Sequence, residues 1–251
     1  MLQRIKINGL TWSPDKNKAS VLDNINIEFE ENQFYGIIGP NGAGKSSLVR
    51  QIVGLKKPSS GNILFDNVDI QSIDKNNIAK KISFLPQSFY RDIDFNVYDV
   101  VSMGREPYRN FFQALKKEEV DIINEALEYT GCIKIKDRSM TTLSGGELQR
   151  VMIARTLVQD TPWIVLDEPV SNLDIKYQLE LMDLLERLRT EKNKTIISVM
   201  HDINLAKSYC TFIVMMKDGK VHEYGNCDEV LTKEKIENLF DLDLKSFQFI
   251  V

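Results

Sequence analysis

A chain of 251 residues is long enough for one large α/β domain or two small ones, and it can bury a sizeable core. Its 32 basic and 36 acidic residues give a net charge of −4, which excludes a global basic field that would draw it to nucleic acid or anionic lipid. Three widely spaced cysteines, Cys132, Cys210 and Cys227, form no C-x-x-C pair and indicate reduced thiols, neither a disulfide framework nor a zinc site.

The first ten residues mix charged and apolar side chains without a long apolar core, so we expect no signal peptide. No run approaches the roughly 20 apolar residues needed to span a bilayer. The sequence therefore predicts a cytosolic protein, and any link to a membrane would come through a partner.

The first third of the chain combines strand patterns with short helices. Two segments alternate apolar and polar residues, the period of half-buried antiparallel strands, and a polar loop that carries Trp12 lies between them. The expected strands lie at 2–7, 21–30, 34–38, within 58–67 and at 82–87, and the expected helices at 46–54 and 73–80.

After Gln87 the pattern becomes helical as far as residue 159, without strands, which indicates a helical subdomain inserted into an α/β core. A buried strand at 163–167, an amphipathic helix and a strand at 195–200 then have the βαβ pattern of a parallel sheet. A hairpin at 212–225 turns at Asp218-Gly219.

We therefore predict a single α/β domain over 1–251: a nucleotide-binding core at 1–87 and 160–251, and a helical subdomain at 88–159. The core would hold a mixed, largely parallel sheet and an N-terminal antiparallel β part.

Residues 39–46, GPNGAGKS, fit the G-x-x-x-x-G-K-[ST] pattern of a phosphate-binding loop between the strand at 34–38 and the following helix. Backbone N–H groups can turn inward around a phosphate only where side chains do not intrude, which explains the three glycines. Lys45 would reach the β- and γ-phosphates, and the Ser46 hydroxyl would hold Mg²⁺. The alternative is a glycine-rich turn that opens an ordinary helix.

The strand at 163–167 ends in Asp167 and is followed by Glu168. An aspartate at the carboxyl end of such a strand can face Mg²⁺ across the phosphate loop, and a neighbouring glutamate can polarise an attacking water. Standing alone, the pair could equally be a strand end with solvated carboxylates. The phosphate loop upstream favours the functional interpretation.

Residues 143–147, LSGGE, directly precede an amphipathic helix. Ser144 would cap that helix, and Gly145 and Gly146 would expose their amides, so the sequence predicts a second anion site. The alternative is a capped helix with a flexible entry, but two successive glycines cost entropy without improving a cap. One nucleotide does not obviously need two such sites.

From residue 2 to about 230 the chain resembles an ATP-binding cassette (ABC) ATPase, which has a P-loop NTPase core. GPNGAGKS resembles the Walker A loop, LSGGE the signature loop, and WIVLDEP the Walker B strand with its glutamate. SNLD at 171–174 resembles the D-loop, Gln87 the glutamine of the Q-loop, and His201 the switch histidine. Six motifs in the family's order make chance agreement negligible.

The resemblance implies ATP and Mg²⁺ as cofactors and a role for each residue. Asp167 would hold Mg²⁺ through water, with Ser46 as a further ligand. Gln87 would help to ligate Mg²⁺ and sense the γ-phosphate. Glu168 would orient or deprotonate the water, and His201 would contact the γ-phosphate. The expected catalytic residues are Glu168, His201, Gln87 and Lys45, and the expected nucleotide-binding residues are Gly39, Pro40, Asn41, Gly42, Ala43, Gly44, Lys45, Ser46 and Ser47.

In this family two nucleotide-binding domains pair head to tail, with ATP between the phosphate loop of one and the signature loop of the other. The resemblance therefore implies an isologous dimer with two ATP molecules. Ser144, Gly145 and Gly146 would act in trans, on the nucleotide held by the second copy.

Two positions depart from the family pattern. The signature loop ends in Glu147 where the commonest form has glutamine, and we expect hydrolysis to survive because this position only flanks the phosphate-binding amides. The expected adenine-stacking tyrosine is replaced by Pro14. Trp12, two residues earlier, either supplies that platform or belongs to the core. His222 lies away from every motif and is expected on the surface.

The chain has no predicted membrane span. In this respect it resembles the cassettes of importers, whose permease is a separate polypeptide. The segments at 97–112 and 201–210 look like the subfamily that serves iron-siderophore, haem and cobalamin uptake. The resemblance implies two integral membrane permease subunits, an extracytoplasmic substrate-binding protein and no nucleic acid as partners. It also implies a peripheral location at the cytoplasmic face of the cell membrane.

In this family the surface after the Q-loop receives a coupling helix of the permease. Phe89, Tyr90, Phe95 and Tyr108 are candidates for that groove, and each could instead belong to the core of the helical subdomain.

An importer ATPase for an iron-siderophore substrate is the favoured function, and haem, cobalamin or a metal ion are alternative cargoes. A soluble ABC ATPase that acts on DNA or ribosomes would be supported by a coiled-coil insertion or basic arms, and neither occurs. A regulatory module without turnover would have lost catalytic positions, whereas Lys45, Asp167, Glu168 and His201 are all present.

Overall fold

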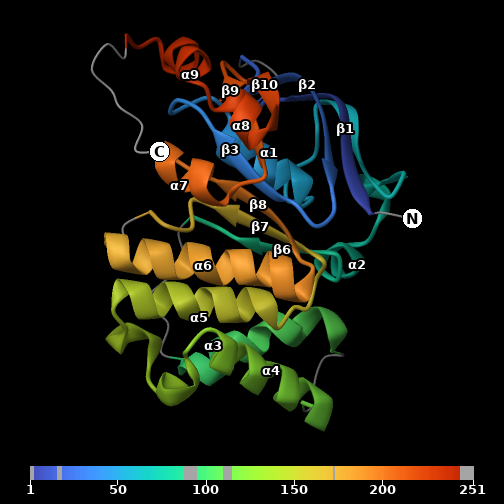
Figure 1. Cartoon of the computed structure of the whole chain (residues 1–251). Coiled ribbons are helices and arrows are strands. Elements are labelled where there is room, and N and C mark those ends of the chain that lie inside the picture. The colour runs from blue at the N-terminus through green and yellow to red at the C-terminus, as the bar shows by residue number, and fades with distance from the viewer. Residues whose placement is uncertain (1–2, 16–18, 88–94, 110–114, 172, 244–251) are drawn as a thin grey trace.

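The structure, a computed structural model, describes residues 3–15, 19–87, 95–109, 115–171 and 173–243. Two sheets occupy the upper part of the view in Figure 1, and a stack of helices lies below them.

The first sheet is antiparallel, and its strand order is β2-β1-β4-β5. Along β1 the side chains of Ile5 and Ile7 are buried and alternate with exposed neighbours, which is the pattern expected for a sheet with one face on the core. Its strands are β1 (Arg4–Trp12), β2 (Leu22–Glu30), β4 (Ser60–Phe65) and β5 (Val68–Asp69).

The expected end of the first strand at residue 7 is wrong, because β1 continues to Trp12. Pairing with β2 shifts register after Ile7 and again after Leu10. Gly9 has a positive φ of 56°, and Asn24 on the facing strand has 51°. These irregularities let the strand bend and still pair, and they break the apolar and polar alternation by which sequence reasoning detects a strand.

The second sheet has six strands in the order β10-β9-β3-β8-β7-β6. Neighbours from β9 to β6 run parallel, and only β10 pairs antiparallel with β9. This confirms the predicted mixed, largely parallel sheet. Its strands are β3 (Phe34–Ile38), β6 (Ile82–Leu85), β7 (Trp163–Asp167), β8 (Thr195–Val199), β9 (Phe212–Lys217) and β10 (Lys220–Asn226).

Helices cover both faces of the six-stranded sheet, and several form where the sequence provides a cap and an apolar stripe. In α6, Asp174 accepts a hydrogen bond from the N–H of Tyr177 at 3.1 Å, and Leu181, Leu185 and Leu188 are buried. The α-helices are α1 (Lys45–Ile52), α2 (Lys75–Ala79), α3 (Val97–Ser102), α4 (Lys117–Tyr129), α5 (Gly145–Leu157), α6 (Ile175–Lys192), α7 (Ile203–Tyr209), α8 (Cys227–Val230) and α9 (Lys233–Phe240). The 3₁₀ helices are η1 (Ile70–Ser72), η2 (Met103–Tyr108), η3 (Ile133–Ile135) and η4 (Met140–Thr142).

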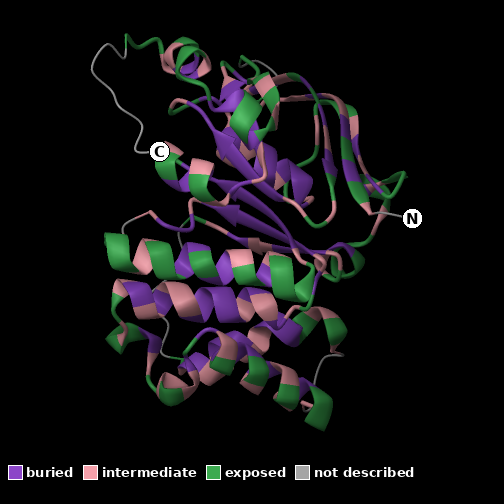
Figure 2. Ribbon diagram, in the orientation of Figure 1, coloured by how far each residue is buried: buried purple, intermediate pink, exposed green. Residues whose placement is uncertain are grey.

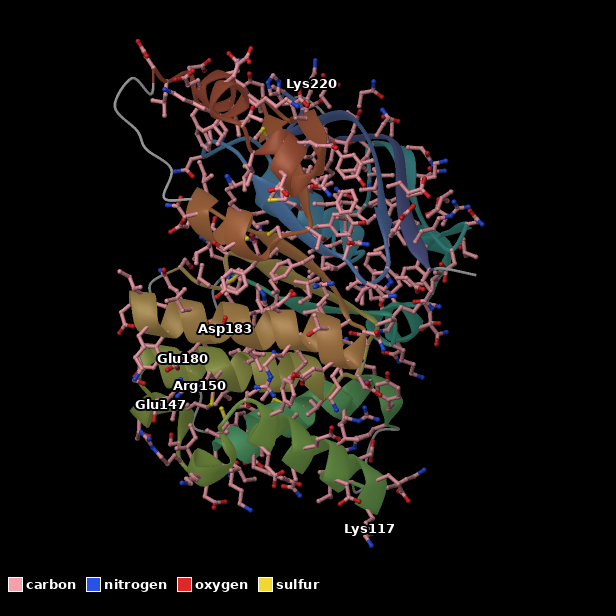
Figure 3. All side chains as sticks on the ribbon, viewed as in Figure 1. Lys117, Glu147, Arg150, Glu180, Asp183 and Lys220 are labelled. Carbon is pink, nitrogen blue, oxygen red and sulfur yellow. The ribbon has the colours of Figure 1, made fainter. Side chains whose placement is uncertain are left out.

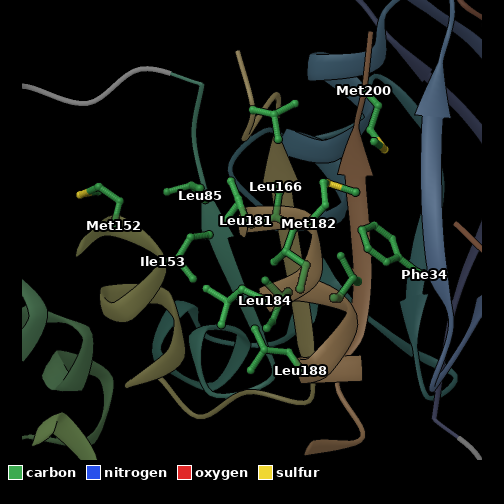
Figure 4. Close-up of a cluster of buried hydrophobic side chains, with 14 of the residues drawn as sticks. Phe34, Leu85, Met152, Ile153, Leu166, Leu181, Met182, Leu184, Leu188 and Met200 are labelled. Atoms are coloured by element: carbon green, nitrogen blue, oxygen red, sulfur yellow. The ribbon is translucent and has the colours of Figure 1, made fainter. Parts of the chain in front are cut away.

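The core divides into two clusters, one on each face of the six-stranded sheet, as the alternation along β3 shows. Tyr35 and Ile37 belong to the cluster between the two sheets, which also contains the buried face of α1. Phe34 and Ile38 belong to the cluster under α5 and α6. Figure 4 shows part of this second cluster, and Figure 2 shows the buried strands between the half-exposed helices. The sheet is therefore buried on both faces, as expected for parallel strands.

Between β6 and β7 the described residues form helices and no named strand. In Figure 1, α3, α4 and α5 lie together below α6, at the end of the molecule away from α1. This arrangement places the loop before α5 in the helical part of the molecule and the loop before α1 between the two sheets.

Candidate active site

The loop between β3 and α1 has a backbone that only glycine tolerates at some positions. Gly39, Gly42 and Gly44 have positive φ values of 149°, 83° and 93°. A Cβ atom on Gly39 would lie 2.0 Å from the Met216 carbonyl oxygen, and one on Gly44 would lie 2.7 Å from the Val21 carbonyl oxygen. The loop thus packs closely against β9 and the residue before β2, and leaves no room for a side chain at Gly39 or Gly44.

Lys45 lies at the start of α1 and is 5% exposed. Its Nζ donates to the carbonyl oxygens of Gly39 and Pro40 at 2.8 and 3.0 Å. Burial lowers its pKa, against the opposite effect of the Glu168 and Asp167 carboxylates. The ammonium group is therefore held inside the loop, where a phosphate oxygen would compensate its charge.

The Ser46 hydroxyl and the Asp167 carboxylate lie side by side and could both act as oxygen ligands of a cation. The Ser46 hydroxyl donates to Asp167 Oδ1 at 2.8 Å, and the other carboxylate oxygen lies 3.4 Å from Arg50 Nη2. Asp167 is fully buried, and burial raises its pKa although Ser46 and Arg50 act in the opposite direction. A hard cation with oxygen ligands would relieve this buried charge, so the two residues fit Mg²⁺.

Glu168 follows directly after β7 and has a left-handed backbone with φ of 55°. Its Oε2 accepts a hydrogen bond from Gln87 Nε2 at 2.7 Å, and its Oε1 lies 2.6 Å from His201 Nε2. Gln87, Glu168 and His201 follow the neighbouring strands β6, β7 and β8, whose carboxyl ends meet at one edge of the sheet. The structure thus brings together residues that lie far apart in the sequence.

The signature loop is built around a capping box. Ser144 Oγ accepts from the N–H of Glu147 at 3.3 Å, and Glu147 Oε2 accepts from the Ser144 N–H at 2.8 Å. A Cβ atom on Gly146 would lie 3.0 Å from the ring of Tyr177 in α6. Among the described residues, the side-chain hydrogen bonds of Ser144 all go to Glu147, and none reaches the phosphate loop. In Figure 3, Glu147 lies at the start of α5, beside Arg150 and Glu180.

The two adenine candidates lie at the end of β1. Trp12 is half-buried and packs against the cluster between the sheets, while its carbonyl oxygen accepts from the Val21 N–H at 2.8 Å. Pro14 is exposed. Trp12 therefore has both a core contact and an accessible part, which agrees with either of its predicted roles. His222 is exposed in β10, as expected.

Sequence reasoning missed two arginines near the site. Arg50 reaches Asp167 from α1, and a signal was present, because residues four apart share a helix face and Arg50 follows Ser46 by four. Arg138 Nη1 donates to Glu147 Oε1 at 2.8 Å from the segment between η3 and η4. No motif marks that segment, so its contact depends on the tertiary fold.

Comparisons with known proteins agree with this geometry. The family model described as ABC transporter matches residues 22–171. The chain is 36% identical to the ferric enterobactin transport ATP-binding protein FepC of Escherichia coli strain K12, over 90% of this chain and 83% of the relative. It is 39% identical to the petrobactin import ATP-binding protein YclP of Bacillus subtilis strain 168, over 89% and 88%.

A solved dimer of the ATP-binding cassette MJ0796, in a post-hydrolysis state with ADP and Pi, superposes with a TM-score of 0.77 at 31% identity. The match covers 89% of this chain and 98% of that one. Among the described residues, no helix is both long and apolar enough to cross a bilayer. The chain belongs to the ABC transporter family and is one of its ATP-binding cassette ATPases.

Proposed function

We propose that this chain is the ATP-hydrolysing subunit of an ABC importer and that it uses Mg²⁺. The observation that carries the proposal is the position of Glu168, whose two carboxylate oxygens contact Gln87 and His201. Asp167, which directly precedes Glu168, accepts from the Ser46 hydroxyl at 2.8 Å. In this proposal Glu168 is a proton acceptor beside the phosphate loop and the cation site.

The residues of the site would share the reaction as follows. The loop amides and Lys45 would bind the phosphates. Ser46, Gln87 and, through water, Asp167 would hold Mg²⁺, which would supply positive charge beside the transferred phosphoryl group. Glu168 orients the attacking water and accepts its proton. His201 contacts the γ-phosphate. Trp12 is the proposed platform for adenine, since its exposed part lies where β1 ends.

The separation of the two anion sites supports a composite active site. In this proposal Ser144, Gly145 and Gly146 bind the γ-phosphate of ATP held by a second copy of the chain, in a head-to-tail dimer with two ATP molecules. The free amides at the start of α5 supply the donors. The helical part at 88–159 carries this loop, and the core at 1–87 and 160–251 carries the rest.

A cavity of ≈ 620 Å³ beside η2 suits a permease helix. Phe84, Met103 and Pro107 provide apolar wall, and Arg109 and Arg155 provide charge. Of the predicted docking residues, Phe95 and Tyr108 are 44% and 38% exposed, and Phe89 and Tyr90 lie outside the described residues. We propose that one permease subunit docks here on each copy of the dimer, so that two permease subunits hold the pair at the cytoplasmic face of the membrane.

The names of the similar proteins favour an iron-siderophore cargo, delivered to the permease by an extracytoplasmic binding protein. Haem, cobalamin or a metal ion are the alternative cargoes. A soluble ABC ATPase without a permease is the second candidate function, and membrane association distinguishes it from the first.

Replacing Glu168 with glutamine tests the proposed function. Glu168→Gln keeps an oxygen that can accept from Gln87 but removes the proton acceptor, so ATP hydrolysis should fall at least about 100-fold while ATP binding persists. ATP should then hold the dimer closed, which sedimentation of the purified chain with ATP would detect. Glu229→Gln, on the surface of α8, is the matched control and should leave both properties unchanged. Hydrolysis near the wild-type rate in Glu168→Gln would exclude Glu168 as the proton acceptor.

A further inference from the structure

Glu147 joins the signature loop to an arginine that no motif contains. Its Oε2 accepts from both the N–H and the hydroxyl of Ser144, each at 2.8 Å. Its Oε1 accepts from Arg138 Nη1 at 2.8 Å. Each carboxylate oxygen therefore has a defined partner, and Arg138 and Ser144 lie on opposite sides of one anion.

The Ser144 hydroxyl has one hydrogen, and Glu147 now receives it. The hydrogen bonds from Ser144, together with Arg138, lower the pKa of Glu147, so the carboxylate stays charged at neutral pH. A phosphate oxygen that approaches Ser144 has to take this hydrogen bond away from a carboxylate. The strength of the hydrogen bond from the Ser144 hydroxyl to Glu147 therefore influences phosphate binding.

In the composite site proposed above, on which this inference rests, Ser144 contacts the γ-phosphate of the partner's ATP. The Ser144 N–H, which donates to Glu147 Oε2 at 2.8 Å, would still hold the carboxylate after the hydroxyl has turned to the phosphate, about 5–6 Å from that phosphate. Like charges at this separation repel each other, and the cationic Arg138 on the far oxygen offsets the repulsion. Glutamine at this position would need no such partner.

We propose that Arg138 is a positioning residue for ATP hydrolysis: acting through Glu147, it orients Ser144 and neutralises the carboxylate beside the γ-phosphate bound in trans. This role is electrostatic and acts through the glutamate, whose Oε1 accepts from Arg138 and whose Oε2 accepts from Ser144.

A purely structural role for Arg138 makes a different prediction. Its Nη2 also donates to the carbonyl oxygen of Thr142 at 2.7 Å and so anchors the segment before the signature loop. If this anchor were the whole role, loss of Arg138 would be equally harmful whether or not residue 147 carries a charge.

The test combines removal of the arginine with removal of the charge, in the full-length Glu168→Gln chain. Arg138→Ala should need about threefold to tenfold more ATP for half-maximal dimerisation, measured by sedimentation, and the defect should shrink at high ionic strength. Adding Glu147→Gln should restore the wild-type ATP requirement, because the amide still accepts from Ser144 but carries no charge. Arg138→Lys, which keeps the charge, should remain near wild type.

Matched controls use the ion pair of Lys235 with Glu223, 3.1 Å apart and far along the chain from the signature loop. Lys235→Ala, alone and with Glu223→Gln, should leave dimerisation unchanged, and thermal melting would verify that every variant folds. A defect in Arg138→Ala that Glu147→Gln fails to rescue, or no defect at all, overturns the inference. If the parent Glu168→Gln chain does not dimerise with ATP, the proposed composite site itself is wrong.

Discussion

At the scale of single residues, Asp167 carries a buried charge that is unfavourable for folding. Its carboxylate is fully buried, and burial raises its pKa despite the Ser46 hydroxyl and the Arg50 guanidinium. A carboxyl group whose pKa is raised on folding destabilises the folded state once the pH exceeds the pKa that the group has in the unfolded chain. The chain therefore keeps at this position a charge that its fold alone would not favour, which is typical of a functional site.

Replacing Asp167 with asparagine should separate stability from function. The amide oxygen still accepts from Ser46, but the buried charge disappears, so without nucleotide or Mg²⁺ the Tm should rise by a few degrees, equivalent to about 1 kcal/mol. ATP hydrolysis should be lost, because the variant can no longer orient the cation. Calorimetry at neutral pH and a phosphate-release assay would measure the two effects. A lower Tm together with normal hydrolysis would contradict both expectations.

At the scale of elements, α5 and α6 are held as one unit behind the signature loop. Gln149 Nε2 in α5 donates to the carbonyl oxygen of Pro169 at 2.6 Å, and Pro169 directly follows Glu168 in the chain. The ring of Tyr177 covers Gly146, and Arg150 lies 3.6 Å from Glu180. These contacts fix the start of α5 against α6, so a bulky side chain there has little room to be absorbed by movement of the helix.

A large residue in the signature loop should therefore block the composite site and spare the rest of the chain. Gly145→Trp should bind ATP as a monomer with wild-type affinity and lose nearly all hydrolysis, because the side chain would stand where the partner's phosphate arrives. Nucleotide titration by fluorescence and an ATPase assay would show the difference. Glu118→Trp, an exposed position in α4, is the control for tryptophan in the helical part. Full activity in Gly145→Trp would refute a site shared between two copies.

At the scale of the whole molecule, two cavities that border the helical part differ in what they could receive. The cavity of ≈ 620 Å³ beside η2 lies between the sheet edge at β6 and the helices, where Ala79 and Phe84 meet Arg155. A smaller one of ≈ 200 Å³ lies at the end of α6 and is lined by Glu125 and Lys192, which pair with each other. Of these two, the larger has the size and mixed lining that a docking helix needs.

Filling the larger cavity should detach the chain from the membrane without affecting the active site. Ala79→Trp should reduce by about tenfold the share of the chain that sediments with membranes of its own cells, while hydrolysis by the purified chain stays normal. Glu125→Trp at the smaller cavity is the control and should leave sedimentation unchanged. If the wild-type chain itself does not sediment with membranes, the result would instead favour the soluble ABC ATPase.

The sequence predicted the parts of the fold whose signals are local. The buried runs that became β3, β7 and β8, and the glycine pattern of the phosphate loop, each depend on neighbouring residues. The order of strands in the sheet and the partners of Glu168 depend on pairings across the chain, so only the family resemblance anticipated that Gln87 and His201 would meet. Arg138 had neither kind of signal.

The strand order also determines when the site can form during synthesis. Within the part of the chain that the structure describes, the strand β3, which leads into the phosphate loop, pairs only with β8 and β9, whose residues follow it by about 160 to 180 positions. Once the phosphate loop of a nascent chain has left the ribosome, β3 therefore has no sheet neighbour until nearly the last strands have also emerged. Closing such long loops is entropically costly and slow. We expect nucleotide binding to appear late and all at once, when β9 docks.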